Sequence, residues 1–141
     1  KNSSYHLVNI LFFLGIIFPF TKSVQPSQNT VSVFGCDVSY YDMPPVGVNH
    51  NHVVLLLHGV KYDKQTWFDL GTLDALSQKG IRVVAVDLPG FGKSSHRRDR
   101  ELDGDFILAL VKNLGLVRPV LVAPSYSGKY AVPMILEHTN E

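Results

Sequence analysis

Two serines near the C-terminal end of the chain carry the residue pattern of a catalytic nucleophile. Residues 120–128 read V-L-V-A-P-S-Y-S-G, so an apolar, β-branched run stops at Ser125 and small residues flank it. A helix-compatible segment, 129–138, follows. This order predicts a strand, a sharp turn and a helix, an arrangement that lifts a hydroxyl above the end of a parallel sheet. A serine held there attacks carbonyl groups and forms acyl intermediates.

The spacing of small residues decides between the two serines. In the pattern G-x-S-x-G the nucleophile lies two residues after one small residue and two before another. Ala123 and Ser127 flank Ser125 in that register, whereas Ser127 has Lys129 at the second small position. We therefore predict Ser125 as the nucleophile. The structural alternative is a serine that ends a strand with a buried hydroxyl.

A second pattern predicts where the negative charge of such a reaction is held. L-H-G-V, residues 57–60, comes at the end of the apolar run 53–57. A glycine there lets the backbone turn sharply and leaves amides pointing into the space above the sheet. Amides in this position stabilise the oxyanion that forms when a carbonyl is attacked. We assign the two donors to the backbone amides of Val60 and Tyr126, and expect His58 to order the backbone.

The stretch D-L-P-G-F-G-K-S-S, residues 87–95, contains the Gly-Lys-Ser of a phosphate-binding loop. That loop also needs a glycine five positions earlier, where this chain has Asp87. A dinucleotide fingerprint fails as well, since Ser95 stands at its third glycine. We interpret the stretch as a turn after a strand, near the catalytic face, with Asp87 capping or bonding the loop.

The elements expected around these residues alternate between strand and helix. Short β-favouring runs at 30–34 and 38–41 predict a hairpin, and the proline-containing stretch 43–51 predicts a loop. Continuous apolar runs at 53–57, 81–86 and 120–123 are typical of strands buried on both faces. Helical spacing at 71–79, with Leu73, Leu76 and Leu70 on one face, and at 105–114 predicts helices between them. This alternation predicts an α/β fold with a mostly parallel sheet and helices on both faces.

The N-terminal segment differs from the rest of the chain. Residues 7–20 are almost wholly apolar, too short for the ~20 residues that span a bilayer as a helix. The run fits the apolar region of a signal peptide, with cleavage expected after Ser23. A membrane anchor and a buried helix of the fold are the alternatives. We therefore divide the chain into a signal peptide or anchor (1–23), a linker (24–29) and a domain (30–141).

Composition excludes several classes of function. The 141 residues carry a net charge of +1, which gives no basis for a nucleic-acid partner. The single cysteine, Cys36, excludes an internal disulfide framework and a multi-cysteine metal site. We predict no cofactor and no metal, and a small acyl substrate as the partner. The apolar N-terminal segment adds membrane association or the secretory pathway as an expectation, with the cytoplasm as the alternative.

The three blocks V-V-L-L-L-H-G, G-I-R-V-V-A-V-D-L-P-G-F-G-K-S and V-L-V-A-P-S-Y-S-G resemble the α/β-hydrolase superfamily in order and spacing, over residues 53–138. Within it, H-G-V-K-Y, T-W-F-D-L-G-T-L-D-A-L and the elbow A-P-S-Y-S-G resemble the α/β-hydrolase-domain-containing 14 family, whose elbow likewise reads P-S-x-S-G. The resemblance implies a serine hydrolase or acyltransferase working on small acyl groups. It puts Ser125 at the nucleophile position and Val60 and Tyr126 at the oxyanion positions. That family has soluble and membrane-anchored members, and the apolar N-terminus favours the anchored kind.

The partners of the serine are missing from the sequence. In this fold the catalytic residues follow the order serine, acid, histidine. After Ser125 the chain offers only His138 as a base and Glu137 and Glu141 as acids. On a continuous helix, 13 residues place His138 ~20 Å from the serine, too far to act as its base. We expect the acid and histidine to lie beyond residue 141, and the domain to be incomplete at its C-terminus.

Three hypotheses for function remain on these grounds. The first is a serine hydrolase that cleaves a small ester, thioester or amide through Ser125. The second is a non-catalytic protein that uses the same fold as a binding module. The third is a phosphate-ligand protein that uses residues 90–95.

Overall fold

An antiparallel hairpin opens the fold, as the sequence predicts. β1 (Ser27–Val33) pairs along its whole length with β2 (Cys36–Met43). Phe34 and Gly35 connect them with φ angles of 48° and 71°, the left-handed pair that matches the twist of a two-residue hairpin. Because β1 begins at Ser27, the second half of the stretch 24–29 belongs to the sheet and not to a linker.

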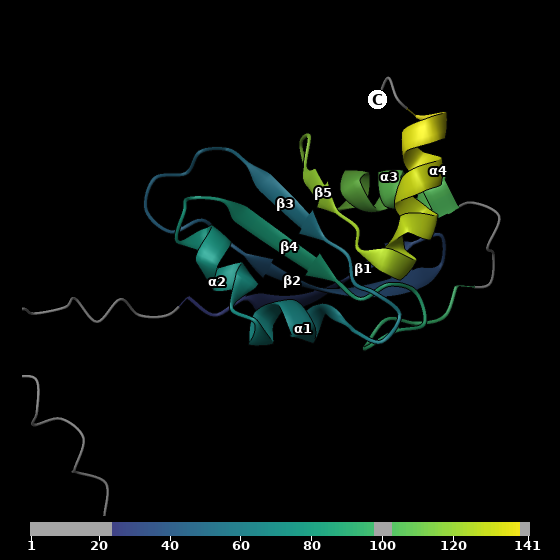
Figure 1. The fold of residues 1–141 in the computed structure, drawn as a ribbon, viewed down its shortest axis with the longest axis horizontal. Coiled ribbons are helices and arrows are strands. Elements are labelled where there is room, and N and C mark those ends of the chain that lie inside the picture. Colours follow the sequence, from purple (N-terminus) through teal and green to yellow (C-terminus); the bar gives the residue numbers. More distant parts are fainter. Residues whose placement is uncertain (1–23, 98–102, 139–141) are drawn as a thin grey trace, which may run out of the picture.

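Three further strands complete a five-stranded sheet. They are β3 (Val53–Leu56), β4 (Arg82–Val86) and β5 (Val120–Val122). The computed structural model describes residues 24–97 and 103–138, and its sheet has the order β1-β2-β4-β3-β5 (Figure 1). β3 is parallel to both β4 and β5, whereas β2 is antiparallel to β1 and β4. The predicted parallel arrangement thus holds for β4, β3 and β5, and the hairpin makes the sheet mixed.

Helices cover both faces of the sheet, as predicted. In chain order they are α1 (Lys64–Asp69), α2 (Thr72–Ser77), α3 (Asp103–Asn113), the one-turn 3-10 helix η1 (Ser125–Ser127) and α4 (Gly128–Glu137). Leu73 of α2 packs in one core cluster with Leu56, and Phe106 of α3 packs in the other with Leu55. Neighbouring residues of a strand point to opposite faces, so these contacts place α2 and α3 on opposite sides of β3.

One helix and one packing position differ from the prediction. α1, between β3 and α2, is not expected from apolar spacing, because its six residues are too few to show a helical period. Asp63 begins it by accepting a hydrogen bond from the Gln65 amide at 2.9 Å. Leu70, predicted to share a buried face with Leu73, is 70% exposed because it lies in the break between α1 and α2.

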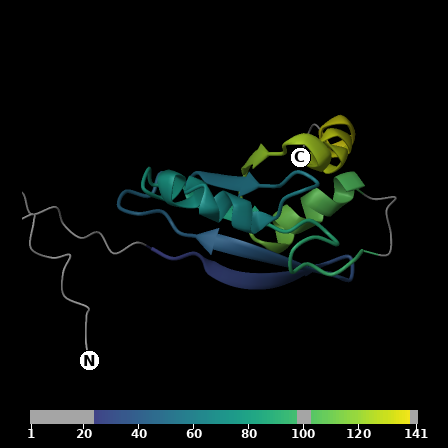
Figure 2. The same cartoon turned by 60° about the horizontal axis from the view of Figure 1, so that its bottom comes forward.

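The predicted buried strand 120–123 lies at an edge of the described sheet. β5 pairs only with β3, and Val120 is 61% exposed. Figure 2 shows β5 leading into α4, with β1 at the other edge. The apolar run therefore predicted the strand correctly but not its exposure, because exposure depends on which strands pair with it in the sheet.

This open edge gives a prediction for residues 24–141 expressed alone. An apolar edge strand and exposed residues such as Val117 and Leu136 favour association between chains. We expect such a chain to aggregate and to leave p-nitrophenyl acetate uncleaved. Light scattering, thermal unfolding and an esterase assay check this. A soluble monomer with a cooperative transition and Ser125-dependent turnover would contradict the expectation.

The predictions for residues 1–23, a signal peptide or membrane anchor, lie outside the described residues. Within 24–97 and 103–138, none of the helices is long and apolar enough to cross a membrane.

Parallel pairing brings three loops to the same edge of the sheet. Leu56 of β3 pairs with Ala85 of β4 and with Val122 of β5, so the three strands end side by side. The carboxyl ends of parallel strands are where open α/β sheets bind ligands. His58, Asp87 and Ser125 each follow one of these strands within three residues.

Candidate active site

The turn after β5 holds Ser125 in a strained backbone conformation. Pro124 is still extended, with φ −75° and ψ 139°, and Ser125 then adopts φ 53°. A left-handed conformation at a non-glycine residue costs about 1–3 kcal/mol and occurs mainly at tight turns and active sites. η1 and α4 start at once after this turn. The geometry is the sharp strand-turn-helix that the sequence predicts.

The two serines of this turn have different surroundings. Ser125 is exposed, whereas Ser127 is buried. The Ser127 hydroxyl donates a 2.8 Å hydrogen bond to the carbonyl of Pro124. Ser127 therefore closes the turn, and Ser125 is the serine that a substrate can reach. This supports the choice of Ser125 made from the spacing of small residues.

The loop after β3 approaches this turn closely. A Cβ atom placed on Gly59 would lie 3.8 Å from Ser125 Cβ and 3.4 Å from the Tyr62 ring. A larger residue than glycine would therefore narrow the space beside the serine. Val60 follows Gly59 in this loop and Tyr126 follows Ser125 in the turn, so the assignment of their amides as oxyanion donors stays a prediction.

His58 holds the Gly59 loop in place. Its Nε2 accepts a 2.9 Å hydrogen bond from the Leu88 amide, and its Nδ1 lies 2.9 Å from the Gly59 carbonyl. An amide only donates, so Nε2 is unprotonated and Nδ1 carries the proton that it donates to Gly59. Both ring nitrogens are occupied, and the ring packs edge-on against Phe91. His58 orders the backbone, as predicted, and is not placed to act as a base.

A buried ion pair below the site was not foreseen from the sequence. Lys64 Nζ lies 2.5 Å from Asp87 Oδ2, and the two side chains are 4% and 0% exposed. Asp87 also accepts from the backbone amides of Lys64 at 2.8 Å and Lys93 at 2.9 Å. The predicted role of Asp87 in bonding its loop is confirmed, and the loop is thereby joined to the start of α1. In the sequence, Asp87 alone pointed to this ion pair, because a carboxylate at the end of a buried strand requires a partner.

The Gly-Lys-Ser stretch uses its polar groups within the fold. Gly92 has φ 50°, and a Cβ there would lie 2.3 Å from Asp87 Oδ2, so only glycine fits. Ser94 Oγ donates to the Asp87 carbonyl at 2.7 Å and accepts from the Ser39 amide at 2.8 Å. Lys93 Nζ donates to Gln28 at 3.0 Å. These contacts support a structural turn in place of a phosphate-binding loop.

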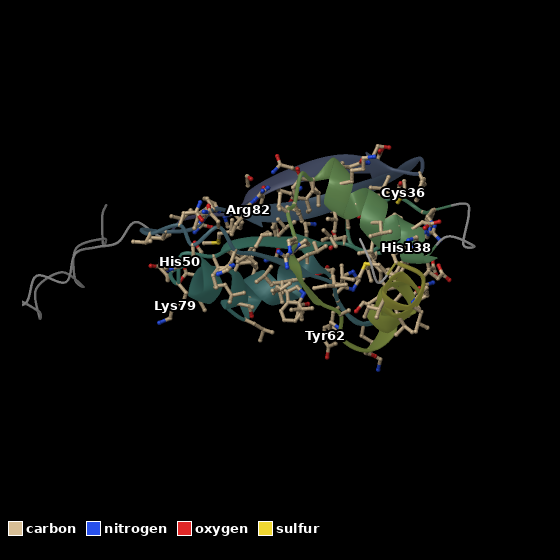
Figure 3. The ribbon with its side chains drawn as sticks, turned by 90° about the horizontal axis from the view of Figure 1, so that it is seen from above. Cys36, His50, Tyr62, Lys79, Arg82 and His138 are labelled. Carbon is tan, nitrogen blue, oxygen red and sulfur yellow. The ribbon has the colours of Figure 1, made fainter. Side chains whose placement is uncertain are left out.

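Cys36 does not compete with Ser125 as a nucleophile. The thiol donates a 3.1 Å hydrogen bond to the Ser95 carbonyl, and burial raises its pKa above the ordinary value. A raised pKa lowers the share of the reactive thiolate. Figure 3 shows Cys36 well away from Tyr62, beside which the serine lies.

A cavity of about 380 Å³ opens next to Ser125. The loop after β3 and the turn after β5 supply His58, Gly59, Pro124 and Ser125, and α1 with its flanks supplies Tyr62, Thr66, Trp67 and Leu70. Its surface is almost entirely apolar. Trp67 is fixed in the wall by a 3.1 Å hydrogen bond from its indole nitrogen to the Leu57 carbonyl.

Sequence comparison agrees with this geometry. The profile of the alpha/beta hydrolase family matches residues 54–136, more than half of the chain. The chain belongs to the alpha/beta hydrolase family. Human ABHD14B, named as a candidate protein-lysine deacylase, is 37% identical over 118 residues, which are 80% of this chain and 56% of that protein. Human ABHD14A is 39% identical over 102 residues, which are 70% of this chain and 38% of that protein.

Solved structures of alpha/beta hydrolases show the same fold. A CIB-like hydrolase from Thermoplasma acidophilum superposes with a TM-score of 0.72 at 24% identity, over 82% of this chain and 58% of its own. The epoxide hydrolase VrEH1 from Vigna radiata superposes with a TM-score of 0.68 at 28% identity, over 81% of this chain and 35% of its own. The fold class and the resemblance to the α/β-hydrolase-domain-containing 14 family are thus confirmed. The chain spans about half the length of the curated relatives it matches.

His138 lies at the far end of α4 from Ser125 and pairs with α3. It follows α4, and its Nε2 lies 2.9 Å from Asp105 Oδ1 of α3. This pair holds α4 against α3. The contact is consistent with the expectation that His138 is not the general base.

Proposed function

We propose that this member of the alpha/beta hydrolase family is a serine hydrolase or acyltransferase with Ser125 as its nucleophile. Ser125 Oγ attacks the carbonyl carbon of a small ester, thioester or amide, and its proton passes to a general base. The carbonyl oxygen becomes an oxyanion held by the Val60 and Tyr126 amides. The leaving group departs with a proton, and water or another acceptor then releases the acyl group from Ser125.

The observation that carries this proposal is the exposed Ser125, held in a left-handed turn after β5 and lining a cavity with the Gly59 loop. The residues described place no histidine or carboxylate in a position to take its proton. We therefore propose that the base and its acid come from other parts of the full-length protein. The relative named as a candidate lysine deacylase suggests that an acylated amine is one substrate to examine.

Covalent labelling tests the proposal. We expect the full-length protein to react with a fluorophosphonate probe, because such probes capture activated serines. Ser125→Ala should abolish labelling, whereas Ser127→Ala, which removes only the bond to Pro124, should retain it. Labelling that survives Ser125→Ala and disappears in Ser127→Ala would overturn the assignment. A protein that never labels would favour the non-catalytic binding module.

A further inference from the structure

We infer that Phe91 is a positioning residue for the reaction at Ser125, because its ring sets the spacing between the two loops that carry the predicted oxyanion donors. This role rests on the proposed function, since it concerns the amides of Val60 and Tyr126. It goes further by giving a part in catalysis to the stretch 87–95, which the proposed reaction does not otherwise use.

The ring of Phe91 packs against two other rings, one from each of these loops. Its centroid lies 5.2 Å from that of the His58 imidazole, at an interplanar angle of 68°, and 5.4 Å from that of the Tyr126 ring, at 57°. Ring pairs in edge-to-face or tilted arrangements attract each other at centroid separations of about 4.5–7 Å. One side chain from the loop after β4 therefore links the loop after β3 to the turn after β5.

Each of these two partners is tied directly to a predicted donor. The Nδ1 of His58 lies 2.9 Å from the Gly59 carbonyl. That carbonyl and the Val60 amide belong to one trans peptide plane, so fixing the carbonyl also fixes the direction of the N–H. Tyr126 carries the second donor on its own backbone, directly after Ser125. A shift of either ring would therefore turn or displace one of the two donors.

The loop that carries Phe91 is itself fixed. The Phe91 amide donates to the Leu88 carbonyl at 2.9 Å, and the Phe91 carbonyl accepts from the Ser94 amide at 2.9 Å. Gly90 and Gly92 adopt φ angles of 83° and 50°, a left-handed conformation that glycine takes without steric cost. The two glycines thus turn the chain on both sides of the ring, and the hydrogen bonds hold that turn in place.

A second set of contacts holds Tyr126 against the start of α4. The Tyr130 ring lies 6.4 Å away, and the Lys129 ammonium lies 5.0 Å from the Tyr126 centroid and 4.9 Å from that of Tyr130. Truncation of Phe91 to alanine would leave these contacts in place and remove the ring that links Tyr126 to His58. The variant therefore acts on the spacing between the two loops.

Steady-state kinetics of Phe91→Ala in the full-length protein test this role. A displaced donor stabilises the oxyanion less but leaves ground-state binding of the substrate almost unchanged. We expect kcat for p-nitrophenyl acetate to fall about 10- to 100-fold, less than the ~10²–10³-fold that loss of a whole donor costs, and KM to change less than about threefold. Phe91→Tyr, which keeps the ring, should retain kcat to within about threefold of the unmodified protein.

Phe68→Ala is the matched control. Phe68 of α1 is 36% exposed, and its ring lies 6.1 Å from that of Tyr41 at 50°, so the variant removes an aromatic contact of the same kind away from the two loops. We expect it to leave kcat and KM unchanged. Equal losses of kcat in Phe68→Ala and Phe91→Ala, or an unchanged kcat in Phe91→Ala, contradict the inference.

Inhibition by trifluoroacetone separates positioning of the donors from general loosening of the fold. A serine hydroxyl adds to this ketone, and the oxygen of the tetrahedral adduct needs the same donors as the oxyanion. We expect the inhibition constant to rise in Phe91→Ala by the same factor as kcat/KM falls, while circular dichroism shows a folded protein. An unchanged inhibition constant beside a lowered kcat contradicts the role. Should Phe91→Ala fail to fold, Phe91→Leu, which is apolar but lacks the ring, replaces it with the same expected pattern.

Fluorophosphonate labelling in the same preparations separates this role from the proposed function. Labelling at Ser125 together with unchanged kinetics of Phe91→Ala removes the positioning role and leaves the proposed function standing. Ester hydrolysis without labelling at Ser125 removes the proposed function, and the positioning role with it.

Discussion

Replacing Ser125 with alanine in the full-length protein is expected to lower kcat for ester hydrolysis by at least ~10³-fold, and by up to ~10⁶-fold if the serine acts in a triad. The reason is that neither of the two competing nucleophiles considered, Ser127 and Cys36, is placed to form the acyl intermediate. Ser127 is buried and bonded to Pro124, and Cys36 is a buried thiol. Steady-state kinetics on p-nitrophenyl butyrate measure the loss.

Ser127→Ala is the matched control for this variant. It removes a hydroxyl two residues away that closes the turn and does not face the substrate. We expect it to retain most of kcat, with a loss of no more than about tenfold from loosening of the turn. Equal losses in the two variants would show that the turn matters only as a structural element, and would contradict the assignment of Ser125.

Replacing Asp87 with alanine is expected to destabilise the protein by about 3–5 kcal/mol. The variant leaves the Lys64 ammonium buried without a counter-charge, and also removes the acceptor of the Lys64 and Lys93 amides. The Lys64 ammonium is shielded from water and would keep only the face of the Tyr41 ring beside it. Urea-induced unfolding of the full-length protein, followed by circular dichroism, measures the change in free energy.

The Arg82–Asp42 pair provides the control for this prediction. Its two hydrogen bonds, of 3.0 and 2.6 Å, join side chains that are 36% and 23% exposed. Solvent screens such a pair, so Asp42→Ala is expected to cost about 1 kcal/mol or less. If Asp87→Ala destabilised the protein no more than Asp42→Ala does, the result would contradict a stabilising role for the buried Lys64–Asp87 pair.

The strands and the site turn were predictable because their signals are local. Continuous apolar runs identified β3 and β4, and two β-favouring runs identified the hairpin, although its turn at Phe34-Gly35 begins one residue earlier than expected. The choice of Ser125 over Ser127 followed from the spacing of small residues alone. The structure adds the φ of 53° at Ser125, which no composition rule predicts for a serine.

Other features depend on the folded surroundings and were not predictable. Lys64 is a residue type that is almost always solvated, and only its approach to Asp87 explains its burial. The sequence of β5 is as apolar as that of β3, yet β5 lies at an edge of the described sheet. Leu70 fits the helical spacing of α2 but lies before its first residue and is exposed. In each case tertiary neighbours, not local pattern, determine the outcome.

The most direct test of the account is to locate the atom that reacts. The full-length protein is treated with a fluorophosphonate and digested with trypsin, and the peptide covering residues 113–129 is sequenced by tandem mass spectrometry. That peptide contains Ser125, Tyr126 and Ser127 together, so its fragment ions distinguish the three hydroxyls. We predict a single adduct on Ser125. An adduct on Ser127 or Tyr126, or only on a peptide outside 113–129, would contradict it.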